Sequence, residues 1–448
     1  MSLKYTISQR LREFYWEHAG LQRLYSASAL SCARWTSVTS DPYTALVHYC
    51  NAARRVRPAG LRAARLKEFA TFVKSQFNAC SPETLDKNIF VRSFLESAEA
   101  DKIRARWSKY SRRQRLNLGG NLILLKAPRE GEHGVLLIFY TGAFAQFLVN
   151  FRLDEVCSRY RVVLEPSWFT FPEPYWALGC SEENPLICQV FDQDAVRAVQ
   201  ECRLPLIALP MGAQDWVDPD VFKPLPGVKK EFDAIMIANF ARYKRHDVMF
   251  RAMQRMRPRR IRLAIVGVTW ERTRAEFEAE VRHFGMERDV VIFQGLSPPQ
   301  VNEVFNKAKV NIFLARMEGG NRGVMEGFAA NVPCIVYKHI YGGVRRSDIN
   351  CATGVFADDE ELHEVLLATT STYDKFQPRA WFLQNTGYQN STAKLNAFLR
   401  EEGIRRREKW TADIVPKANR PEPVYISERD KASLEGGWDE LERSLTKL

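Results

Sequence analysis

Residues 315–336 read A-R-M-E-G-G-N-R-G-V-M-E-G-F-A-A-N-V-P-C-I-V, and the organisation of the chain is best understood from this stretch outward. It begins at the end of a short apolar run, V-N-I-F-L-A (310–315), which is typical of a buried strand. Residues 324–330 are the small and apolar residues of a buried helix, and Asn331-Val332-Pro333 ends that helix before a second strand at 334–337. The stretch therefore predicts a strand, a glycine-rich turn, a helix and a strand.

The turn has the chemistry of a phosphate site. A glycine-rich turn that leads into a helix offers unpaired backbone N–H groups and the positive end of the helix dipole. Glu318 lies where the first strand ends, the edge at which open α/β sheets bind ligands. Glu326 lies near the start of the helix, where its carboxylate can accept two hydroxyl hydrogen bonds from a ribose. The alternative is a pair of surface glutamates that flank an ordinary strand–helix turn.

The segment resembles the donor-binding signature of retaining GT-B glycosyltransferases of group 1 (family 4), approximately E-G-F-G-x-x-x-x-E-A-x-A-x-G-x-P-V-I. Three further segments resemble family motifs in the correct order. They are L-P-M-G-A-Q-D-W-V-D-P-D-V-F-K-P (209–224), L-A-I-V-G (263–267) and C-A-T-G-V-F (351–356). The resemblance is loose over residues 134–400 and carries motifs over 206–356.

The resemblance implies an α/β fold of the GT-B class, with two Rossmann-like domains that face a cleft, preceded by a mainly helical basic extension. The hydrophobic pattern and composition along the chain predict the helical region at 1–115, the first (acceptor) domain at 116–222, the second (donor) domain at 228–400 and a charged tail at 401–448. Strand–helix alternation from Gly120 onward indicates parallel sheets. The Pro-rich residues 219–227 are the expected interdomain linker.

The resemblance also implies the activity and the roles of individual residues. A sugar moves from a nucleotide-diphosphate sugar to an acceptor with retention, and fixed cations rather than a metal neutralise the departing diphosphate. Glu318 and Lys244 are the expected catalytic residues, and Glu326 holds the ribose. The other expected donor-binding positions are Gly319, Gly320, Asn321, Arg322 and Gly323 in the turn, with Arg242, Asn239, Gly142 and Thr353 elsewhere.

Two positions depart from the family pattern. The Arg that accompanies the Lys of this family falls on Asn239, so Arg242 and Arg322 are candidates for its role. Family members often carry a His near the sugar, but the first domain contains only His133, in an expected hairpin turn, and the role is not assigned to it.

The sequence predicts neither a metal nor a cofactor. Two D-x-D triplets, at 192–194 and 218–220, match the metal motif of the other glycosyltransferase fold, but the first suits a helix cap and the second lies in the linker motif. Nine Cys without zinc spacing argue against a structural metal and suit a reducing cytoplasm. The uncharged run 134–151 is interrupted by Thr141-Gly142 and by polar residues, so we expect no membrane span.

The positive charge is concentrated in the first quarter of the chain. Residues 1–120 hold 21 Lys and Arg against nine Asp and Glu, whereas the rest holds 44 of each. Basic residues at 54–67 and 102–115, interleaved with aromatic residues, indicate either an anionic membrane surface or a solvated helical face that covers the next domain. Nucleic acid is a weaker alternative because no nucleic-acid module accompanies the charge.

Three functions fit these observations. The favoured one is a cytoplasmic glycosyltransferase, peripheral on the inner membrane face, with a polysaccharide or lipid-linked acceptor. The second keeps the GT-B scaffold without activity, as a partner subunit, in line with Asn239 and the missing His. The third is a basic nucleic-acid-binding protein.

Overall fold

A computed structural model describes residues 15, 18–38, 41–54, 56, 58–78, 89–166, 172–175, 184–191, 193–202 and 204–447. The chain forms two compact units. Unit 1 comprises residues 1–212, 396–416 and 422–448, and unit 2 comprises residues 213–395 and 417–421.

Unit 1 is built on a five-stranded sheet in the order β1-β2-β3-β4-β5. The first two strands form an antiparallel hairpin, and the remaining pairs are parallel. The strands are short runs of Leu, Ile and Val that are largely buried, as expected for a sheet covered on both faces. Their bounds, with those of the helices between them, are β1 Leu122–Lys126, β2 Gly134–Phe139, α8 Thr141–Asn150, α9 Leu153–Cys157, β3 Tyr160–Glu165, β4 Leu186–Gln189, α11 Gln193–Cys202 and β5 Leu206–Leu209.

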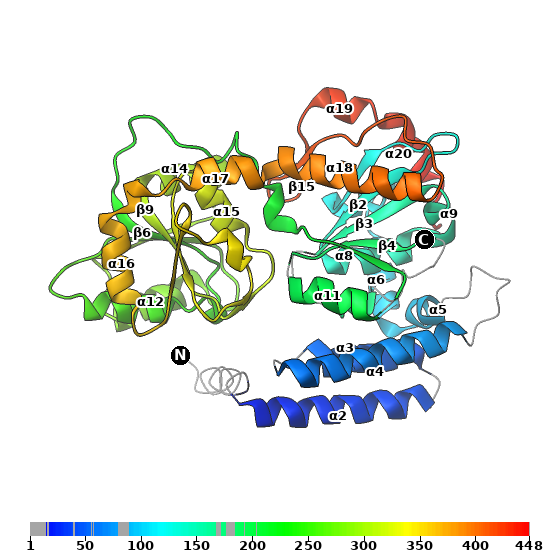
Figure 1. The fold of residues 1–448 in the computed structure, drawn as a ribbon, viewed down its shortest axis with the longest axis horizontal. Helices are drawn as coiled ribbons and strands as arrows, with labels where there is room; N and C mark the ends of the chain where they lie inside the picture. Colours follow the sequence, from blue (N-terminus) through cyan, green and yellow to red (C-terminus); the bar gives the residue numbers. More distant parts are fainter. Residues whose placement is uncertain are drawn as a thin grey trace. The chain divides into compact units, whose positions relative to one another are not determined.

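A helical region precedes this sheet and shares its core. Figure 1 shows the first three described helices lying side by side (blue). Phe90 and Phe94 are fully buried in the same hydrophobic cluster as Leu122 of β1 and Phe144 of α8. The helices are α2 Ala19–Val38, α3 Pro42–Arg54, α4 Ala59–Asn78, α5 Ile89–Leu95, α6 Ala98–Trp107 and α7 Arg112–Leu116. The helical region is therefore part of the unit 1 core rather than a separate appendage.

Unit 2 contains a six-stranded parallel sheet in the order β13-β11-β9-β6-β7-β8. Alternate residues of the central strand β6 enter two hydrophobic clusters, one with α12, α13 and α16 and the other with α14, α15 and α17 (Figure 1). The bounds are β6 Phe232–Ile237, α12 His246–Arg255, β7 Leu263–Gly267, α13 Arg274–His283, β8 Val290–Gln294, α14 Pro298–Lys307, β9 Ala308–Phe313, α15 Arg322–Ala329, β11 Cys334–Tyr337, β13 Gly354–Ala357, α16 Leu362–Ser371 and α17 Pro378–Asn385.

The C-terminal part of the chain contributes to both units. Helix α18 (Gly387–Arg405) begins in unit 2 and ends in unit 1. Residues 417–421, which include β14 (Lys417–Asn419), belong to unit 2, and β15 (Pro423–Tyr425), α19 (Glu428–Ala432) and α20 (Glu435–Glu442) belong to unit 1. In unit 1, the hydroxyl of Tyr425 donates to the carbonyl of Leu124 at 2.8 Å. The charged tail thus supplies packed structure to each unit.

The expected α/β fold class is confirmed. The chain has two Rossmann-like units with mainly parallel sheets and a helical N-terminal region. No described helix combines the length and the apolar character needed to span a membrane.

The described arginines of the basic face expected at residues 54–67 do not form an open cationic surface. Arg62 is buried, Arg54 pairs with Glu173 at 2.9 Å, and Arg65 pairs with Glu68 at 3.0 Å. Because these guanidinium groups have partners within unit 1 or lie in its interior, they do not supply free charge to a partner. Arg55 and Arg57 lie outside the described residues.

Candidate functional site

The glycine-rich turn of unit 2 is held by short-range hydrogen bonds. Met317 and Glu318 form β10, which pairs in parallel with β12 (Tyr341–Gly342). Asn321 is the N-cap of α15, because its side-chain oxygen accepts from the backbone N–H of Val324 at 3.1 Å. The backbone N–H of Asn321 donates to the carbonyl of Gly343 at 2.9 Å. The turn therefore has a fixed conformation and leads directly into the N-terminus of α15, as the sequence predicts.

Two of its glycines are closely packed against other side chains. A Cβ at Gly323 would lie 3.1 Å from the Cβ of Ile237 on β6, and one at Gly320 would lie 2.0 Å from the side chain of Gln214. Gly319 is buried as well. The glycines thus let this backbone lie against the end of β6 and the side chain of Gln214.

The structure brings the two expected catalytic residues into contact. Lys244 ends the short helix η4 (Arg242–Lys244) that follows β6, and its Nζ forms an ion pair with Oε2 of Glu318. The two side chains are only 10% and 9% exposed. Seventy-four residues separate them in the chain, so the contact exists only because β6 and β9 are neighbours in the sheet. Glu318 therefore does not have the surface position that the alternative interpretation requires.

Tyr243 is a neighbour of this pair that sequence reasoning missed. The ammonium of Lys244 lies 5.0 Å from the centre of its ring. Burial, assisted by the nearby Glu318 carboxylate, raises the pKa of Tyr243 to about 12. Its hydroxyl accepts a long hydrogen bond (3.4 Å) from the amide of Asn239, the residue at the family's Arg position. Tyr243 thus keeps a neutral hydroxyl beside the ion pair.

The same loop contains two further basic residues, Arg242 and Arg245, which lie in different environments. Arg242 is half-buried, and its backbone N–H donates to Oε2 of Glu271 at 2.9 Å. Arg245 is buried in the left-handed conformation, with φ of 59°. Its guanidinium binds Asp359 and the carbonyl of Leu314. Arg245 therefore holds the loop in place, and its charge is already paired.

Glu326 lies in the second turn of α15 and is half-buried. Burial raises the pKa of its carboxyl group, while the positive charge of Arg322 opposes the shift. Arg322 itself donates to the carbonyl of Pro421 at 2.6 Å. A half-buried carboxylate one turn beyond the glycine loop has the position expected for a hydroxyl acceptor.

Thr353 and Gly142 lie elsewhere. The Thr353 hydroxyl donates to the carbonyl of Asp348 at 2.6 Å and accepts from the N–H of Asn350 at 2.9 Å, so it holds the turn before β13. Gly142 is in the first turn of α8 in unit 1, where an added Cβ would meet no atom within 4 Å. The donor-binding roles of both residues stay predictions.

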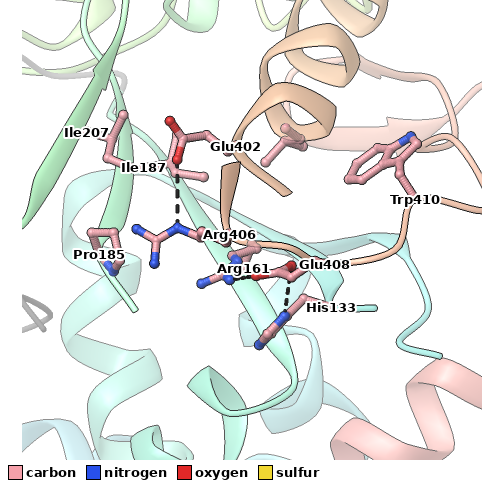
Figure 2. Close-up of a pocket in the computed structure, with 10 residues that line it drawn as sticks. His133, Arg161, Pro185, Ile187, Ile207, Glu402, Arg406, Glu408 and Trp410 are labelled. Carbon is pink, nitrogen blue, oxygen red and sulfur yellow. Dashed lines mark hydrogen bonds and ion pairs between the residues drawn. The ribbon is translucent and has the colours of Figure 1, made fainter. Parts of the chain in front are cut away.

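His133 lies in a different environment, which Figure 2 shows. It directly precedes β2, and its Nδ1 lies 3.0 Å from Oε2 of Glu408. Burial and the charges of Arg161 and Arg406 lower the pKa of His133 to about 4. The surrounding pocket is at the amino ends of the unit 1 strands, whereas α/β sheets bind ligands at the carboxyl ends. His133 therefore lies at the opposite edge of the unit 1 sheet from the one at which ligands bind.

The D-x-D triplets offer no evident metal site. Asp192 lies outside the described residues. Asp218 is fully buried, pairs with Arg420, and accepts from the N–H of Asp220 at 2.8 Å. Within the described ranges, no three His, Cys, Asp or Glu side chains gather in a way that could hold a metal ion.

Comparison with known proteins gives one family match and distant structural likenesses. A search of curated proteins finds no match. Among solved structures, sucrose-phosphate synthase from Thermosynechococcus elongatus is 13% identical, with a TM-score of 0.49 over 73% of this chain and 82% of that one. HepE of Anabaena in complex with UDP is 14% identical, with a TM-score of 0.46 over 59% and 78%. A glycosyltransferase from Rickettsia africae is 13% identical, with a TM-score of 0.47 over 76% and 89%.

The family model matches the part of the chain that carries the site. It is described as glycosyl transferases group 1. It covers residues 218–369, which begin in the segment between β5 and β6 and end in α16. Lys244, the glycine turn, Glu318 and Glu326 all lie within it. Residues 218–369 of this chain are thus similar to the group 1 glycosyl transferases.

Proposed function

We propose that the protein transfers a sugar from a nucleotide-diphosphate sugar to an acceptor, with retention at the anomeric carbon and without a metal. The observation that carries the proposal is the buried Lys244–Glu318 ion pair beside the glycine turn of α15. Diphosphate departure develops negative charge, which a preorganised cation and free backbone N–H groups stabilise. The family match over the same residues supports this use of them.

The residues have complementary roles in this proposal. The turn N–H groups and Lys244 bind the diphosphate, with Arg322 and Arg242 as further cations. Glu318 lies at the sugar, where it contacts hydroxyls or assists at the reacting face, and Glu326 accepts the ribose hydroxyls. Because Lys244 neutralises Glu318 in the free protein, a donor phosphate that attracts Lys244 also releases the carboxylate for the sugar.

A panel of UDP-, GDP-, ADP- and CMP-sugars in a thermal-shift assay tests donor binding, because a ligand that binds the folded state raises its stability. Hydrolysis of the bound donor without acceptor tests turnover, and proton NMR of the first-formed sugar anomer tests retention. Turnover that persists after treatment with a metal chelator supports metal independence.

The observation that favours an inactive scaffold is Asn239, whose neutral amide replaces a family Arg and contacts Tyr243. A scaffold would bind a donor without hydrolysing it. Hydrolysis by the wild type that Glu318→Ala and Lys244→Ala both abolish excludes this alternative.

For the acceptor, we propose a lipid-linked glycan or polysaccharide at an anionic membrane surface. Helix α2 carries Leu24, Trp35 and Val38, which are 70%, 70% and 82% exposed, with the exposed Arg23 and Arg34 beside them. An exposed apolar stripe with flanking cations suits the headgroup region of an anionic bilayer. The excess positive charge of residues 1–120 supports this partner over a neutral one.

Point substitutions test this surface better than a deletion, because deleting the helical region would expose the core it shares with the sheet. We expect Leu24→Glu/Trp35→Glu to reduce flotation with vesicles of phosphatidylserine and phosphatidylcholine. Trp270→Glu, at a tryptophan of unit 2 that is 69% exposed, is the matched control. Equal flotation of all three proteins would remove the membrane from the proposal, and tighter salt-sensitive binding to RNA or DNA would favour a nucleic-acid partner.

A further inference from the structure

Gln214 is a buried polar residue without an evident structural purpose. It lies in the short helix η3 (Ala213–Trp216), which packs against α15 in unit 2. Its side chain is 0% exposed, and neither Oε1 nor Nε2 has a hydrogen-bond partner among the described residues. The neighbouring residues are tied into unit 2, since Asp215 accepts two bonds from Arg345 and the Ala213 carbonyl accepts from Asn419.

The amide of Gln214 lies directly against the glycine turn. A Cβ built at Gly320 would be 2.0 Å from Oε1 and 3.0 Å from Cδ of Gln214. Gly320 does not have a positive φ, so this position requires glycine for close approach and not for an unusual backbone conformation. The turn backbone at Gly320 therefore lies beside the amide oxygen of Gln214.

An unsatisfied amide in this place costs stability. Burying an amide without hydrogen bonds is unfavourable, whereas an apolar side chain of similar size fills the same space at no such cost. A buried polar group that is left unsatisfied in a native protein calls for an explanation, and a role in a functional state is one such explanation. The backbone at Gly320, which carries N–H and C=O groups of the turn proposed to bind the diphosphate, lies beside this amide.

We propose that Gln214 is a positioning residue of the donor site, whose amide hydrogen-bonds the backbone of the Gly319–Gly323 turn when the turn binds a nucleotide diphosphate. The inference rests on the proposed function. It assigns Gln214 no contact with the donor. The residue acts by holding the turn in its ligand-bound conformation, and donor binding in turn satisfies the amide.

The proposal predicts that replacing the Gln214 amide weakens nucleotide-sugar binding without lowering the stability of the free protein. Gln214→Met removes the unsatisfied amide and keeps the volume, so we expect an unchanged or higher Tm for the free protein. The same variant should bind the nucleotide sugar about tenfold more weakly, the loss of one or two net hydrogen bonds. Isothermal titration with the best ligand of the UDP-, GDP-, ADP- and CMP-sugar panel measures the Kd, and calorimetry measures the Tm. A residue with only a packing role would move neither quantity or lower both.

Gly320 supplies a second, steric test. Gly320→Ala should bind the same ligand more weakly than Gln214→Met, because its methyl group collides with the amide and displaces the turn. Gln214→Ala/Gly320→Ala removes the collision and should recover affinity to the level of Gln214→Ala alone. The inference is overturned if the wild type binds and Gln214→Met has the same Kd, or if the double variant binds no more tightly than Gly320→Ala. Either result leaves the proposed function intact. Absence of binding by the wild type to every member of the panel overturns both.

Discussion

Removing both members of the Lys244–Glu318 pair should cost unit 2 less stability than the sum of the losses from removing each member alone. Lys244→Met leaves the carboxylate of Glu318 buried without its cation, and Glu318→Gln leaves an ammonium in the same position. Truncating one partner of a buried ion pair typically costs about 3–5 kcal/mol. Because each side chain is about one-tenth exposed, we expect the lower end, ~3 kcal/mol, for each single variant.

The double variant Lys244→Met/Glu318→Gln has neither charge, so its loss should be smaller than the sum of the two single losses. We expect a coupling free energy of about 2 kcal/mol, within the range found for residues of one ion-pair network. For a unit of this size, a loss of ~3 kcal/mol lowers Tm by roughly 6–12 °C.

The assay is differential scanning calorimetry of the four proteins, following the transition of unit 2. Lys338→Met is the matched control, because Lys338 pairs with Asp358 at 3.0 Å on the exposed surface of the same unit. Exposed pairs contribute about 0–1 kcal/mol, so this control should differ little from the wild type. Additive losses, or single variants as stable as the control, would refute the buried pair.

Two further predictions concern stability. The folded pKa of His133 is about 4, below its unfolded value of 6.5, so its contribution is fully present above pH 6.5 and is lost as pH falls toward 4. Chemical denaturation at a series of pH values measures the free energy of unfolding. Across this window the wild type should lose about 2 kcal/mol more of it than His133→Gln does, and identical pH profiles would contradict the lowered pKa. Gly323→Ala should lose about 1–3 kcal/mol by crowding Ile237, whereas Gly436→Ala, with no atom within 4 Å in helix α20, should be neutral or slightly stabilised; equal stabilities in urea would show that the turn has room to adjust.

The sequence allowed much of the fold and of the site to be predicted because local signals agree there. The apolar run before Glu318, the glycines and the stop at Asn331-Val332-Pro333 each point to the same strand–turn–helix unit, which the structure contains. The hairpin of β1 and β2 and the parallel sheets follow from similar short-range patterns. The roles predicted for individual donor-binding residues await the binding experiments.

Features that depend on long-range packing were not predictable. Nothing in the composition of residues 401–448 indicates that Arg420 reaches the buried Asp218, or that Trp410 lies over Lys126 with its ring centre 3.3 Å away. The burial of Arg62 was equally hidden, because an amphipathic pattern does not reveal which face a neighbouring helix covers. Gln214 gave no signal either, since only the three-dimensional approach of Gly320 makes its amide unusual.

The central claim is that the turn ahead of α15, together with Lys244, binds the diphosphate of an activated sugar. Calorimetric titration of the wild type, Lys244→Ala and Glu326→Gln with the four classes of nucleotide sugar tests it most directly. The account predicts that the wild type binds one class and that both variants bind it at least tenfold more weakly. Absence of binding to any class, or equal affinity in all three proteins, would contradict it.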